Sequence, residues 1–158
     1  MQTIEFGAFR VRCDPDETRE VYARFDVSGA EDCGCEPCYN FALARHLVYP
    51  TDVLDLFDWL GVDPLLESEV VYNGCLERGL HSYSGFFHVV GELEACPVPP
   101  LSGPERRGAA LVGEPSRIAL GFFDVQASVP EAFDCRSIVE LEFCACVPWI
   151  SVAPEPIA

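Results

Sequence analysis

The stretch that decides the expected fold is His81–Ala95, with the sequence HSYSGFFHVVGELEA. Valine and aromatic residues favour strands, and Gly85 and Gly91 interrupt the run. We therefore expect one long strand that is bent or bulged at its glycines. Residues 69–75 have a similar composition and predict a strand immediately before it.

Other segments predict further strands on both sides of this stretch. Residues 3–12 alternate crudely and predict a strand that ends in a turn. Residues 20–27 alternate clearly between apolar and polar side chains, which predicts a half-buried antiparallel strand hairpinned to the first. Residues 118–127 and 138–147 predict two more strands, separated by a turn at Pro130.

Between these strand segments lies one helical segment. Residues 39–47 predict a short helix that Pro50 ends, and Thr51 is the expected N-cap of a second helix that stops at Gly61. The apolar face of that second helix is expected to comprise Val53, Leu54, Phe57 and Leu60. The predicted class is α+β, a mainly antiparallel sheet with a helical hairpin inserted after the second strand.

Length and composition indicate a single domain over residues 1–158. The chain is 49% hydrophobic, which is enough to form one core. Residues 97–117 are rich in proline and glycine and predict a surface loop, and residues 150–158 predict an extended tail.

The charge of the chain excludes several functions. The net charge is −16, and all 10 basic residues are arginine. Without lysine there is no Schiff-base chemistry and no phosphate-loop lysine, and so acidic a surface disfavours nucleic-acid binding. The same charge favours a basic protein as partner.

The sequence predicts a cytoplasmic protein. It has no signal-peptide pattern at Met1–Phe6 and no run of about 18 apolar residues, so no membrane segment is expected. Nine cysteines, an odd number, are then best explained as reduced thiols, some of them metal ligands.

Three of these cysteines lie within six residues. Cys33, Cys35 and Cys38 have the spacing C-x-C-x2-C on a loop that leads into a helix. Such a loop brings sulfurs together around one ion, which predicts a structural zinc site. Zinc usually takes four ligands, and the favoured distant fourth ligands are Cys75 and His88.

Other interpretations of the same stretch remain open. The three thiols can simply pack, without metal, in the loop. Cys35–Cys38 also has the C-x-P-C form of thioredoxin-like redox sites, although the surrounding carboxylates disfavour a thiolate and the flanking chain lacks the β-α-β pattern. A hydrolase built around His81 or His88 is a weaker alternative, and Cys144 and Cys146 are expected to pack on one face of a strand.

These motifs resemble a loose set of small bacterial proteins with a DCxCxxCxNF knuckle followed by an LGxDP turn, here Asp32–Phe41 and Leu60–Pro64. The resemblance implies one domain and brings no established activity or cofactor. We expect a non-enzymatic interaction module with a structural metal knuckle, and the alternative is a thiol-disulfide oxidoreductase acting through Cys35 and Cys38.

Overall fold

The computed structural model of the chain describes residues 1–95, 118–124, 129–134 and 136–157. Its strands are β1 (Gln2–Phe6), β2 (Phe9–Cys13), β3 (Glu69–Glu77), β4 (Leu80–Ala95), β5 (Ile118–Phe123) and β6 (Ile138–Pro148). Its helices are α1 (Pro15–Tyr22), α2 (Gly29–Cys33), α3 (Glu36–Ala44) and α4 (Thr51–Leu60), with short 3-10 turns η1 (Arg45–Leu47) and η2 (Glu131–Phe133).

The strands form one antiparallel sheet in the order β1-β2-β4-β6-β5. Strand β4 organises it: β6 pairs along one side of β4, while β3 and β2 pair with its first and second halves on the other. The α+β class and the antiparallel sheet are thereby confirmed, as are β3, β4 and β6 within a few residues.

Gly85 and Gly91 of β4 allow neighbouring strands and side chains to pack closely, because glycine has no side chain. The pairing register of β4 with β6 continues through Gly85 without a shift, so the expected bulge is not there. A Cβ at Gly85 would lie 2.5 Å from the Glu69 carbonyl oxygen and 2.6 Å from the Phe143 ring. The register shifts instead on β3, around Gly74, whose φ is +127°, and near the end of β4, where Arg10 pairs with Ala95 but Val11 pairs with Leu93.

The N-terminal predictions were wrong in two places. Residues 3–12 form a tight hairpin, β1 and β2, which turns at Gly7 with φ +58°. Residues 20–27, expected as a strand, contain the end of helix α1 and a turn. A helix forms here because Asp14 caps it, accepting a hydrogen bond from the Glu17 N–H at 3.0 Å. Pro15, in the first turn, also favours the start of a helix.

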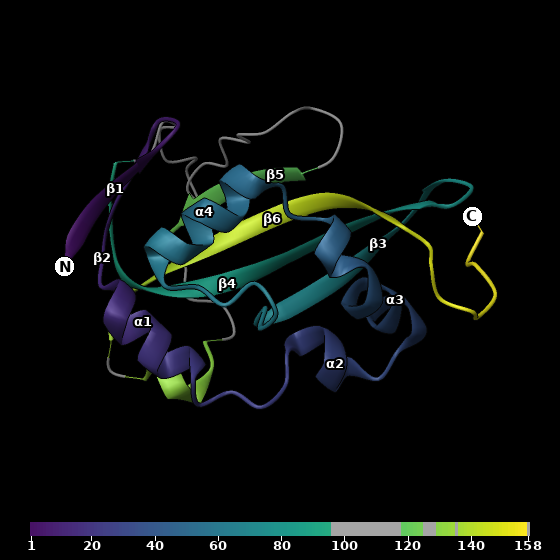
Figure 1. Cartoon of the computed structure of the whole chain (residues 1–158), viewed down its shortest axis with the longest axis horizontal. Coiled ribbons are helices and arrows are strands. Elements are labelled where there is room, and N and C mark those ends of the chain that lie inside the picture. The colour runs from purple at the N-terminus through teal and green to yellow at the C-terminus, as the bar shows by residue number, and fades with distance from the viewer. Residues whose placement is uncertain (96–117, 125–128, 135, 158) are drawn as a thin grey trace, which may run out of the picture.

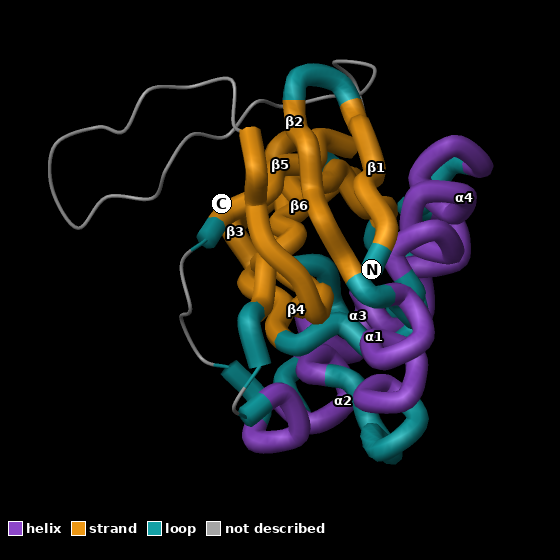
Figure 2. Tube along the Cα trace, turned by 90° about the vertical axis from the view of Figure 1, so that its left-hand side faces the viewer, coloured by secondary structure: helices purple, strands orange, loops and turns teal. Residues whose placement is uncertain are grey.

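All four helices lie between β2 and β3 in the chain and gather on one side of the sheet (Figures 1 and 2). Helix α4 ends at Gly61, with φ +77°, as expected, but Pro50 rather than Thr51 is its N-cap. Leu56 takes the buried place expected of Leu54, which is 41% exposed. Part of the core is an aromatic cluster, in which Phe87 contacts Phe57 and Phe143, and Tyr49 contacts all three.

The remaining segment predictions concern the loops. The loop predicted at 97–117 lies outside the described residues. The tail after β6 has neither helix nor strand through residue 157 and returns beside the tip of the β3–β4 hairpin (Figure 1). None of the helices in the described part of the chain has the length and apolar composition needed to span a membrane.

Candidate metal centre

The predicted cysteine knuckle is the junction of two short helices. Cys33 is the last residue of α2, Gly34 ends that helix with φ +70°, Cys35 is the N-cap of α3, and Cys38 lies in the first turn of α3. A left-handed residue between two thiols reverses the chain within one residue, which is why the C-x-C spacing converges. Nothing lies within 4 Å of a Cβ built at Gly34, so glycine is required there for its conformation alone.

The three sulfur atoms all lie within 4.8 Å of one another, and those of Cys33 and Cys35 are 3.4 Å apart. Two sulfurs bound to the same zinc at about 2.3 Å and tetrahedral angles are about 3.8 Å apart. The observed spacing therefore matches a shared metal ion, whereas a disulfide would need about 2.05 Å. The residues present are able to hold a metal ion through three sulfurs.

Burial and hydrogen bonding divide the three thiols into two kinds. Cys33 and Cys35 are exposed, and hydrogen bonds from Cys35, first its backbone N–H, lower the pKa of Cys33. Cys38 is buried, and desolvation raises the pKa of its thiol well above the ordinary value. The positive end of the α3 helix dipole lies at this junction.

The knuckle is anchored to the sheet through Asn40 and Tyr83. The side-chain amide of Asn40 donates to the Pro148 carbonyl at 3.1 Å and to Tyr83 Oη at 3.3 Å, and its oxygen accepts from the N–H groups of Ile150 and Ser151. Tyr83 Oη in turn donates to the Pro37 carbonyl at 3.0 Å. Both side chains are fully buried, so the start of α3 is held in a fixed position.

A buried ion pair fixes α2 from the other side. Arg45 donates to Glu67 at 3.1 Å, to Glu31 at 2.9 Å and to Ser28 Oγ at 3.1 Å. Ser28 and Glu31 also cap α2 reciprocally. Desolvation raises the pKa of Glu67, while the capping hydrogen bond from the Ser28 backbone lowers that of Glu31.

Cys33, Cys35 and Cys38 form the cysteine triad, and neither of the favoured fourth ligands lies with them. Among the described residues, no further cysteine, histidine or carboxylate lies within 4.8 Å of all three sulfurs. His88 is buried in β4 and its Nδ1 lies 2.8 Å from Ser68 Oγ. Cys75 instead lies in a second cluster, with His81 and Glu155. The sequence does not predict that cluster because one of its members, Glu155, comes from the tail, 74 positions after His81.

Cys144 and Cys146 do lie on one face of β6, as expected, but it is the more exposed face, so packing in the core does not explain them.

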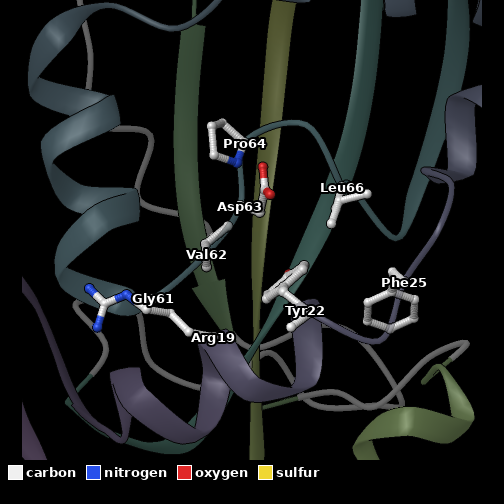
Figure 3. A pocket seen from close by; sticks show the side chains of 9 residues that line it. Arg19, Tyr22, Phe25, Gly61, Val62, Asp63, Pro64 and Leu66 are labelled. Carbon is white, nitrogen blue, oxygen red and sulfur yellow. The ribbon is translucent and has the colours of Figure 1, made fainter.

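The described residues also form an open pocket of about 570 Å³, away from the thiols (Figure 3). It lies between α1 and the loop after α4, where Arg19, Tyr22, Asp63 and Leu66 line it. The Tyr22 hydroxyl is committed to the backbone of His88, donating to its carbonyl at 3.0 Å and accepting from its N–H at 3.1 Å. No histidine, cysteine, serine or threonine is among the described residues that line this pocket.

No protein-family model matches the chain, and no curated protein or solved structure is detectably similar to it. The assignment of function therefore depends on the chemistry of the site.

Proposed function

We propose that this protein is a metal-stabilised interaction module, in which Cys33, Cys35 and Cys38 hold a structural zinc ion. The observation that supports this proposal is the convergence of three sulfurs within 4.8 Å. Thiolate ligands favour zinc over magnesium or calcium. The fourth position is taken by water or by a ligand from a partner.

The zinc ion would stabilise a junction that is weak by itself. Helix α2 has five residues and α3 has nine, and helices of this length are marginal in water. A shared ion ties the end of one to the start of the other and fixes the direction of α3.

The interaction surface in this proposal is the exposed side of α3. Tyr39 and Leu43 are 53% and 38% exposed and are four residues apart, so they share one face of the helix. Glu36, one turn before Tyr39, adds a carboxylate to that face. An apolar strip bordered by acidic residues on a chain of charge −16 suits a basic protein partner.

The metal part of the proposal is tested by elemental analysis and native mass spectrometry of protein purified without chelator or nickel resin. We expect zinc in the wild type and loss of one zinc per chain in Cys33→Ser/Cys35→Ser. The matched control is Cys146→Ser, which removes a thiol outside both clusters. Equal zinc content in the wild type and the double variant would contradict the proposal.

The partner part is tested by pull-downs from lysate at low and high salt. We expect a basic protein that is retained at low salt, released at high salt, and lost with Tyr39→Ser/Leu43→Ser. Leu54→Ser is the matched control, because Leu54 is similarly exposed but lies on α4. A set of captured proteins that is the same for the double variant and the wild type would count against this surface.

One observation favours thiol-disulfide exchange as a second candidate. Cys35 is an exposed thiol at the N-cap of α3, and Cys38 is a buried thiol three residues later, which is the arrangement of an attacking and a resolving cysteine. The Cys35 thiolate would attack a substrate disulfide, and Cys38 would then release the substrate as a dithiol while the pair becomes oxidised. Reduction of insulin disulfides by the metal-free protein, lost in Cys35→Ser, would favour this candidate over the structural site.

A further inference from the structure

A second cluster of metal-ligating side chains lies at the tip of the β3–β4 hairpin. Cys75 and His81 are direct cross-strand partners on β3 and β4, and Glu155 reaches them from the C-terminal tail. The sulfur, an imidazole nitrogen and a carboxylate oxygen all lie within 4.8 Å of one another. These three donor types are those that zinc uses in proteins.

Hydrogen bonds and ring contacts around the cluster hold its three metal-ligating side chains close to one another. The Nε2 atom of His81 lies 3.0 Å from Glu155 Oε1, which also accepts the Gly79 N–H at 2.5 Å. The Gly79 carbonyl accepts a hydrogen bond from the backbone N–H of Trp149 at 3.1 Å. The segment after β6 is therefore fixed to the hairpin at two points. The Trp149 ring, 5.0 Å from the imidazole, closes one side.

Tyr72 occupies the position of an outer partner for a metal-binding histidine. Its hydroxyl lies 3.0 Å from Nδ1 of His81, on the opposite side of the ring from Glu155. A histidine that binds metal through one nitrogen usually donates its other N–H to such a group, which fixes the ring and its tautomer. The His81 side chain has no exposed surface, so its orientation is fully determined by these neighbours.

We propose that Cys75, His81 and Glu155 form a second zinc site, independent of the cysteine triad, that leaves one coordination position open. Three protein ligands with an open position are the pattern of zinc sites that accept water or an external ligand. The open side is available because Cys75 is partly exposed and the Glu155 side chain is 20% exposed.

The proton balance of binding follows from the contacts. Zinc binding at Nε2 requires the His81 tautomer that carries its proton on Nδ1. In that tautomer Nδ1 donates to the Tyr72 hydroxyl, which lies 3.0 Å away. The Cys75 thiol releases its proton to solvent, and Glu155 binds as a carboxylate.

The test uses the full chain with the triad disabled by Cys33→Ser/Cys35→Ser, treated with chelator and then titrated with Co²⁺ and Zn²⁺ as the probe metals. We expect one Co²⁺ per chain, with the near-ultraviolet absorption of a thiolate ligand, and its displacement by Zn²⁺. In the same background, Glu155→Gln and Cys75→Ser should each weaken binding at least about tenfold, and Tyr72→Phe about 10- to 100-fold. Cys146→Ser is the matched control and should leave the affinity unchanged.

The variants at Glu155 and Cys75 should fold, because both residues lie at a partly exposed edge. His81 is not substituted, because its side chain is fully buried. A folded triad-disabled protein that binds no metal would overturn the second site. Binding that is unaffected by both Glu155→Gln and Cys75→Ser would overturn it as well. Failure of the triad would appear differently, as one zinc in the wild type that Cys33→Ser/Cys35→Ser retains and Glu155→Gln weakens.

Discussion

The guanidinium of Arg45 and the carboxylate of Glu67 form a buried ion pair, with Nη1 and Oε1 3.1 Å apart. The pair joins η1 to the segment before β3 and holds α2 through Glu31. The same arginine also donates to the Leu65 carbonyl at 2.9 Å. One side chain thus connects three segments that surround the cysteine knuckle.

Arg45→Met should lower the free energy of unfolding by about 3–5 kcal/mol, because it leaves the buried Glu67 carboxylate without its oppositely charged partner. Urea denaturation at neutral pH measures this loss. Arg19→Met is the control: Arg19 pairs with Asp16 and Asp58 but is half exposed, so about 1 kcal/mol or less is expected. Equal losses of stability for the two variants would show that the buried ion pair contributes no more than the exposed one.

Gly34→Ala tests the left-handed turn between the thiols. Because space is available there, only the conformation opposes the new side chain, and the expected cost is about 1–2 kcal/mol. Gly61→Ala should cost more than about 3 kcal/mol, since its Cβ would lie 2.2 Å from the Pro15 carbonyl oxygen. Urea denaturation in the presence of chelator compares the two, and the reverse order would contradict the interpretation.

The cap of α1 predicts a pH dependence. The hydrogen bond from the Glu17 N–H lowers the pKa of Asp14 in the folded protein relative to the unfolded chain. Asp14 therefore stabilises the fold above its unfolded pKa of about 3.9, and this contribution is lost as the pH falls through the lower folded value. Asp14→Asn keeps a capping side chain but removes the charge. The stability difference between wild type and variant should be constant from pH 5 to 7 and shrink towards pH 2.

The elements that could be predicted from sequence are those with one strong local signal. β3, β4 and β6 are rich in β-favouring residues, and α4 has both an amphipathic face and a glycine stop. The sequence predicts a strand over the end of helix α1 and the turn after it because Val21, Ala23, Phe25 and Val27 alternate by chance. Its cap, Asp14 followed by Pro15, was read as a turn.

The sequence predicted the cysteine triad correctly as a cluster because its three members are neighbours in the chain. It could not predict the second cluster in the same way, because 74 residues separate His81 from Glu155. The one local signal was the six-residue spacing of Cys75 and His81 around Gly79, whose φ of +81° makes the hairpin turn. That spacing predicts a cross-strand pair once the hairpin is recognised, but not the carboxylate from the tail.

Site-resolved alkylation of the thiols by mass spectrometry separates the metal site from simple packing. In metal-free protein, Cys33 should react fastest, since it is exposed and its pKa is lowered, and Cys38 slowest, since it is buried and its pKa is raised. Adding two equivalents of Zn²⁺, one for each proposed site, should slow Cys33 and Cys35 at least about tenfold, because a coordinated thiolate is no longer a free nucleophile. Cys144 is the internal control, because it is exposed on β6 and outside the triad. If zinc leaves the rates of Cys33 and Cys35 unchanged relative to Cys144, the three sulfurs are close without sharing a metal ion.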